Sequence, residues 1–154
     1  MSSITDHSDQ ADYNGPMVRW LENSLWGVGR LREAVEQGRA PEALRLLRSG
    51  VPVRDTWGSL FHAVEQGNVE LCHCLLNNGA DPDALDGQGN LPLHHAIRNG
   101  NENLAELLLC YTTEVSRANL HSETPLSLAV RYDRHQVVDH LDQMLGERVE
   151  REAV

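Results

Sequence analysis

The sequence predicts an all-α solenoid, in which helix-turn-helix units joined by short β-turn fingers stack side by side. The first indication is a repeat, because the letters AVEQG occur at residues 34–38 and again at 63–67. A pair of leucines follows each copy at the same spacing, and a further pair, Leu108 and Leu109, lies 33 residues after the second. A fixed period of this length indicates units that bury their apolar faces only against their neighbours.

Four such units are expected, at about residues 30–54, 55–85, 86–118 and 119–145. In each unit a short first helix ends at a residue, usually glycine, that adopts the left-handed backbone at little cost, and a second helix carries leucines. The first two units are 29 residues apart instead of 33. The finger between them, SGVPVRDTWG, is therefore about four residues shorter than the next one.

Three shorter segments flank the units. Residues 1–15 are polar and acidic, and we expect a disordered tail. Residues 16–29 predict an N-terminal capping helix. Residues 146–154 are expected to form a C-terminal tail.

The capping helix is delimited by residues typical of helix ends. Pro16 is favourable in the first turn, and Gly27 and Gly29 are expected to stop the helix. Its aromatic residues, Trp20 and Trp26, have two interpretations. They cover the open end of the stack, or they anchor a partner, because aromatic residues dominate binding hot spots.

Charge and composition narrow the classes of partner and compartment. The formal net charge is −10 at pH 7, and no basic stripe is present, so we expect neither nucleic acid nor a membrane surface as a partner. No apolar run reaches the length of a membrane span, and residues 1–15 lack the features of a signal peptide. Three cysteines in helical surroundings favour a reducing compartment, which is the cytoplasm or the nucleus.

The chain contains thirteen arginines and no lysine. Two explanations stay open for this bias. Arginine codons replace lysine codons in a GC-rich genome, or the protein avoids the amines to which ubiquitin is attached. The second explanation favours a protein that works beside ubiquitin ligases.

Residues 79–109, GADPDALDGQGNLPLHHAIRNGNENLAELLL, resemble an ankyrin repeat. The unit of that family is a β-turn finger, the pattern G-x-T-P-L-H-x-A at the start of an inner helix, and a return helix that ends near paired leucines. Eight residues lie on the pattern: Gly89, Pro92, Leu93, His94, Ala96, Gly100, Leu108 and Leu109. The resemblance covers about residues 30–145 and implies a solenoid that binds proteins.

The resemblance also assigns structural roles and shows departures from the family pattern. It implies that His94 hydrogen-bonds neighbouring backbone and holds units together. Phe61 replaces this histidine in the second unit, and Leu91 replaces the capping threonine in the third. In the fourth unit Asp133 stands for the helix-ending glycine and Asp142 for a leucine, which suits a terminal unit with one face in water.

The last two units are similar to the last repeats of the small ankyrin inhibitors of cyclin-dependent kinases. Those inhibitors are short, acidic proteins of four or five repeats. The ankyrin inhibitors of the NF-kappaB kind are a second family with acidic arrays. Neither similarity extends into the first two units.

No motif for metal binding or catalysis is complete. Cys72 and Cys74 are about 200° apart around a helix, so their thiols diverge instead of converging on a zinc ion. Acidic residues up to Asp86 resemble the start of a calcium loop. However, Leu85 and Pro92 stand where further oxygen ligands are required. We therefore expect no metal, no cofactor and no enzyme activity.

The exposed sides of the first helices and the fingertips are expected to line a concave wall. One aligned position reads Glu36, Glu65, Arg98 and Arg131, so the wall changes from acidic to basic along the stack. Such a gradient orients a partner and speeds encounter. The predicted contact residues are charged, polar or aromatic: Trp57, His62, Glu65, Gln88, Asn90, His95, Arg98, Arg131 and Tyr132.

The sequence thus predicts a non-enzymatic protein–protein interaction module that acts as an inhibitor or adaptor. Its partner is expected to be another protein, with a basic surface facing the acidic first two units. Three alternatives stay open. They are a ubiquitin-ligase-associated adaptor or host-directed effector, an ankyrin-type inhibitor of a kinase or transcription factor, and a metal or redox protein built on the cysteines.

Overall fold

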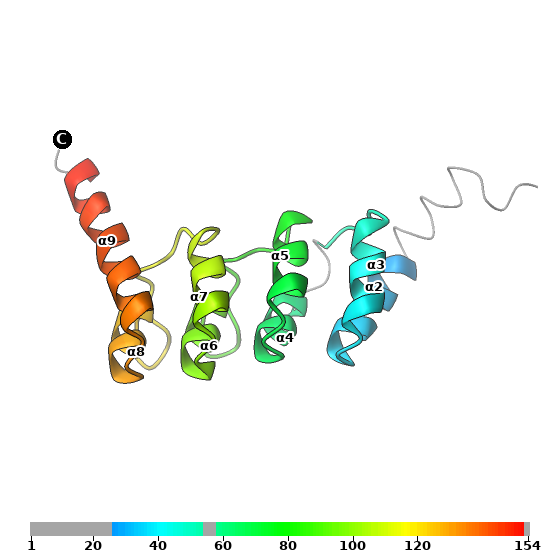
Figure 1. Ribbon diagram of the computed structural model, residues 1–154, viewed down its shortest axis with the longest axis horizontal. Helices are drawn as coiled ribbons and strands as arrows, with labels where there is room; N and C mark the ends of the chain where they lie inside the picture. Colours follow the sequence, from blue (N-terminus) through cyan, green and yellow to red (C-terminus); the bar gives the residue numbers. More distant parts are fainter. Residues whose placement is uncertain (1–25, 54–57, 153–154) are drawn as a thin grey trace, which may run out of the picture.

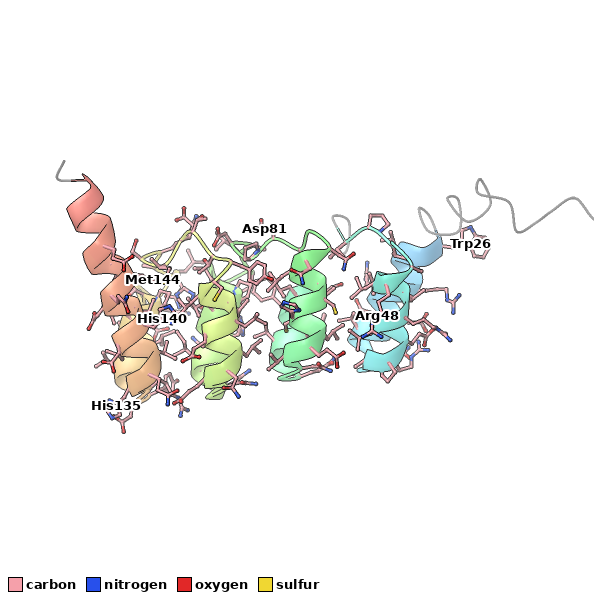
Figure 2. All side chains as sticks on the ribbon, turned by 45° about the horizontal axis from the view of Figure 1, so that its top comes forward. Trp26, Arg48, Asp81, His135, His140 and Met144 are labelled. Atoms are coloured by element: carbon pink, nitrogen blue, oxygen red, sulfur yellow. The ribbon has the colours of Figure 1, made fainter. Side chains whose placement is uncertain are left out.

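The computed structural model of the chain describes residues 26–53 and 58–152. The expected tail at 1–15 and most of the expected helix at 16–29 lie outside these residues, as do Trp20 and Trp57. Of the aromatic residues near the N-terminus, Trp26 is described, and its indole is largely exposed beside the first helix (Figure 2).

The described residues form helices that pair along the chain, with no strand among them. The first helices of the pairs are α2 (Gly27–Glu36), α4 (Ser59–Glu65), α6 (Pro92–Asn99) and α8 (Pro125–Arg131). The second helices are α3 (Ala40–Arg48), α5 (Val69–Asn77), α7 (Glu102–Leu109) and α9 (His135–Glu152). First helices contact first helices in chain order, and second helices contact second helices. Figure 1 shows the pairs side by side, and the predicted all-α stack is confirmed.

Local sequence explains where the helices begin and end. Asn68 and Asn101 cap α5 and α7, because their side chains accept hydrogen bonds from the backbone N–H groups of the third helical residues. The turn between paired helices needs a left-handed residue, and Gly67 and Gly100 supply it with φ of 68° and 76°. In the last pair Asp133 takes this position with φ of 58°, as its place in the repeat predicts.

The apolar core runs as one layer through the whole stack. Its side chains come from both helices of every pair, and the leucines repeat at equivalent positions. Leu75 and Leu108 hold the same place in consecutive second helices, and both are fully buried. Each pair thus covers the apolar face of the one before it, which is the main source of stability in such a stack.

Two helix ends differ from the sequence prediction. Gly27 and Gly29 were expected to stop a capping helix, but both lie inside α2, whose Leu31 and Val35 are fully buried. Burial of that face outweighs the cost of about 1 kcal/mol per helical glycine. At the other end, α9 continues through residues 146–152, which were expected to be a tail. Those residues contain no proline that would end the helix.

No helix of the described residues combines the length and apolar character needed to cross a bilayer.

We predict that Leu108→Ala lowers the free energy of unfolding by about 2–5 kcal/mol, because the truncation leaves a cavity in a layer that cannot fully collapse. Leu120→Ala is the matched control, since Leu108 is 0% exposed and Leu120 is 76% exposed. The control should change stability by no more than about 0.5 kcal/mol. Urea unfolding followed by circular dichroism measures both. Equal losses in the two variants would contradict the layer described here.

Candidate functional site

The surface predicted to bind a partner is formed by the exposed side chains of the first helices and by the finger turns that precede them. We call it the first-helix face. Between the second and fourth helix pairs, hydrogen bonds connect the polar groups of this face. They run from the finger before α6 to the finger before α8. The geometry of these bonds decides which side chains are available to a partner.

Asp86 organises the finger that precedes α6. Its carboxylate accepts hydrogen bonds from the backbone N–H groups of Gln88 and Asn90, both at 2.8 Å, and from Nε2 of His95 at 2.8 Å. Burial alone would raise the pKa of Asp86, but these bonds and one from the Asn90 side chain hold it well below its usual range. Asp86 therefore stays ionised and fixes both the turn and the imidazole of His95.

Asn119 holds the same place in the next finger, 33 residues later. Its Oδ1 accepts from the backbone N–H groups of His121 and Glu123, both at 2.9 Å. Its Nδ2 donates to Oδ1 of Asn90 at 2.8 Å and to Oε2 of Glu123 at 3.0 Å. One amide therefore shapes its own finger and ties it to the finger before.

The Glu123 carboxylate binds both Arg98 and Arg131, which hold the same helical position in consecutive repeats. Arg98 Nη2 donates to Oε2 of Glu123 at 3.4 Å, and Arg131 donates to Oε1. The hydrogen bond from Asn119 and the charges of Arg131 and Arg98 lower the pKa of the Glu123 carboxyl. Arg98 comes from α6 and Arg131 from α8, so one carboxylate connects two helix pairs.

His94 lies beneath this cluster and joins the same two pairs through the backbone. Its Nδ1 accepts from the N–H of Leu91 at 3.0 Å, so the neutral ring carries its proton on Nε2, which donates to the carbonyl of Glu123 at 3.1 Å. The structural role implied for His94 is confirmed. Burial lowers its pKa, because the buried ring disfavours the charged form.

Four of the predicted contact residues, Asn90, His95, Arg98 and Arg131, are joined through Asp86, Asn119 and Glu123 into one hydrogen-bonded group. His62 and Glu65 lie on α4 with partly exposed side chains, and Nδ1 of His62 is 4.0 Å from Oε2 of Glu65. Gln88 and Tyr132 are exposed at a finger and at the end of α8. Trp57 lies outside the described residues.

Asn90 does not have the role that the sequence suggested. Asn90 is 0% exposed. Its side-chain Nδ2 donates to the Asp86 carboxylate, and its Oδ1 accepts from the side chain of Asn119. A buried amide in this position serves the joint between fingers, so a partner cannot contact it. Leu128 of α8 holds the same helical position as His62 and His95 but is fully buried, so the fourth pair offers no exposed side chain at this position.

The charge gradient is also weaker than the aligned letters indicate. Arg98 and Arg131 share Glu123, which neutralises one of their two charges. At the other end of the stack, Glu36 pairs with Arg32 at 2.8 Å. What remains is an excess of one positive charge in the Arg98, Glu123 and Arg131 group. On α4, Glu65 lies near His62.

Sequence reasoning missed the two residues that hold the face together, Asn119 and Glu123. The 33-residue register could have found them, since Asp86 and Asn119 align, as do Asn90 and Glu123. What the letters did not reveal is that Asn119 of one finger bonds to Asn90 of the finger before it.

The remaining polar clusters and cavities give no metal centre in the described part of the chain. No group of three or more His, Cys, Asp or Glu side chains is placed to hold an ion among these residues. Cys72 is fully buried, and its desolvation raises the pKa of its thiol to about 12, so it stays protonated. A cavity of about 550 Å³ between α4 and the following finger is lined mainly by apolar side chains, among them Leu60, Phe61 and Leu85.

Comparison with known families agrees with this architecture. The family described as "Ankyrin repeats (3 copies)" matches residues 31–119 and again 60–151. The chain belongs to the ankyrin-repeat family. Ankyrin repeats are protein–protein interaction modules, so the chain carries a module of this kind.

Relatives of this ankyrin-repeat chain occur in animals and bacteria. It is 30% identical over 103 residues to human "ARF GTPase-activating protein GIT1", covering 66% of this chain and 14% of that protein. It is 30% identical over 95 residues to a "Putative ankyrin repeat protein" of Rickettsia bellii (strain RML369-C), covering 58% of this chain and 56% of that protein. With mouse "Rabankyrin-5" it shares 28% identity over 140 residues, or 75% of this chain and 12% of that protein. The chain thus spans 12% to 56% of the length of these relatives.

We predict that the stability of this ankyrin stack falls as the pH drops below about 6.5, the ordinary pKa of histidine. His94 stays neutral in the folded protein and is protonated in the unfolded chain. The unfolded state therefore binds more protons, and acidification lowers its free energy relative to that of the folded state. Urea unfolding between about pH 7.5 and 5 measures this loss above the range where carboxylates titrate.

His94→Gln should be less stable by about 1–3 kcal/mol at neutral pH, because it loses the bonds to Leu91 and Glu123, and its stability should vary less with pH in this window. His121→Gln, at an exposed position, is the control and should keep the slope of the unmodified chain. A slope unchanged by His94→Gln would assign the pH dependence to other residues.

Proposed function

We propose that the chain is a non-enzymatic binding module that acts as an inhibitor or adaptor by occupying a partner protein through its first-helix face. The observation that carries this proposal is the fixed cluster of Arg98, Glu123 and Arg131, which holds arginine side chains at the surface of two adjacent repeats. Arginine and aromatic residues are enriched in binding hot spots, and Tyr132 follows Arg131 at the same place.

The chemistry of the face supports binding over catalysis. The buried thiol of Cys72 is held protonated, so it is not an activated nucleophile. The polar groups of the fingers form hydrogen bonds within and between fingers, and these bonds hold the first-helix face rigid. Rigid, preorganised side chains lower the entropic cost of binding a macromolecule.

We propose that the partner presents a basic surface to the first two repeats. Glu33, Glu36 and Glu65 are exposed there on α2 and α4. Glu33 and Glu36 already pair with Arg39 and Arg32, so the attraction of a basic surface rests mainly on Glu65 of α4, over the range that salt permits. We place this binding in the cytoplasm or the nucleus. The three free cysteines support a reducing compartment.

A ubiquitin-ligase-associated adaptor is the second candidate, and the absence of lysine favours it. A chain without lysine offers no side-chain amine for ubiquitin transfer while it is held near a ligase. Recovery of a ligase subunit with the purified chain would select this candidate over the general one.

The proposal is tested by affinity capture from a native cell extract with quantitative mass spectrometry. We predict that Glu65→Arg and Arg131→Glu each reduce recovery of the bound protein by about tenfold, which corresponds to about 1.4 kcal/mol. Arg48→Glu is the matched control, since Arg48 lies on α3 among the second helices (Figure 2) and is exposed. It should recover the partner at the unmodified level.

The same proteins recovered equally by all variants would show that the first-helix face does not bind them. Circular dichroism of each variant verifies that the stack is intact, so a loss of binding is not a loss of fold.

A further inference from the structure

We infer that the cluster of Arg98, Glu123 and Arg131, called here the arginine clamp, is a subsite for a carboxylate, an Asp or Glu side chain of the bound protein. This inference rests on the proposed function and names the chemistry that one part of the face recognises. Together with the acidic side chains of α2 and α4, the clamp would select a partner whose charge changes sign along the contact.

The charges of the clamp do not cancel. Two guanidinium groups meet one carboxylate, whose Oε1 accepts from Arg131 and whose Oε2 accepts from Arg98 and Asn119. Both oxygens of Glu123 are therefore engaged, and one positive charge remains.

The clamp also has hydrogen-bond donors to spare. Each guanidinium carries five N–H donors, and within the part of the chain that the structure describes each of the two makes one hydrogen bond, to Glu123. The Arg98 side chain is 34% exposed and that of Arg131 is 60% exposed, so the remaining donors are accessible to a partner. Guanidinium groups match carboxylates geometrically, often through two parallel bonds.

The anchor of the clamp is rigid. The Glu123 side chain is largely buried, its backbone N–H donates to Asn119, and its carbonyl accepts from His94. Both arginines are thus held by a residue that belongs to the joint between two repeats. A partner carboxylate would meet donors that are already in place, which removes part of the entropic cost of ordering long side chains.

The register of the repeats explains why an acid is expected here and not elsewhere on the face. The same helical position holds Glu36 in α2, Glu65 in α4, Arg98 in α6 and Arg131 in α8. A partner acid placed over α4 would meet the Glu65 carboxylate at this position, whereas Glu36 of α2 is already paired with Arg32. Like charges disfavour that placement, so the sequence of charges fixes the direction in which a partner lies along the stack.

The inference is tested by nuclear magnetic resonance on the isotope-labelled full chain with capped hexapeptides as probes. We predict that hexaglutamate shifts the side-chain Nε–H signals of Arg98 and Arg131, with a weak, salt-sensitive affinity. Hexaglutamine, which has the same length and no charge, should shift neither signal. Hexalysine should instead shift backbone signals of α2 and α4, around Glu65.

Arg131→Gln should reduce the response to hexaglutamate by about tenfold or more, because it removes the more exposed donor group and leaves the Arg98–Glu123 contact in place. Arg48→Gln on α3 is the matched control and should leave the response unchanged. The double variant Arg98→Gln with Arg131→Gln should abolish it, with urea unfolding used to verify the fold.

Three results would overturn the inference. They are no shift at the clamp, an equal shift at Arg48, or a response that persists in the double variant. A phosphoserine hexapeptide that shifts the clamp where hexaglutamate does not would assign the subsite to phosphate instead of carboxylate. If Glu65→Arg weakens partner capture while hexaglutamate leaves the clamp signals unshifted, this inference fails and the proposed function stands.

Discussion

The burial of apolar faces between successive helix pairs is the constraint on which the rest of the structure depends. Leu75 and Leu108 occupy equivalent places in α5 and α7, and both are covered completely because the next pair packs against them. Neither helix of a pair could hide such a face alone. Once the pairs are forced side by side, the fingers and first helices are also brought into register, and the polar contacts between repeats on the first-helix face follow from that spacing.

The polar contacts solve a problem that the apolar stacking creates. Close-packed pairs bury the backbone between fingers, and a buried donor or acceptor left without a partner costs about 1–3 kcal/mol. This cost is avoided by hydrogen bonds at the joint between the third and fourth pairs, which involve Asn90, His94 and Asn119. The same bonds fix Glu123 and, through it, the two arginines. A requirement of stability thus also holds two exposed arginines in place on the face.

This coupling has a consequence for the way such a face can vary. Side chains at the fingers, such as Asp86 and Asn119, are tied to the stack and cannot change without disturbing it. Side chains at the C-terminal ends of the first helices, such as Glu65 and Arg131, carry exposed charge and are not part of the core. Substitutions at the exposed helical positions can therefore change which partner binds, while the finger positions preserve the geometry of the stack. In this way one scaffold serves many partners.

The sequence by itself determined the all-α solenoid, its register and the structural role of His94, because those depend on periodic apolar residues and on short-range turn chemistry. It also placed Arg98 and Arg131 at one aligned position. Only the tertiary structure decided that Asn90 is buried and that Glu123 holds both arginines. It also decided that α2 includes the glycines expected to end a helix. Each of these depends on atoms from two different repeats meeting in space, and a one-dimensional pattern gives the order of the units but not the contacts between them.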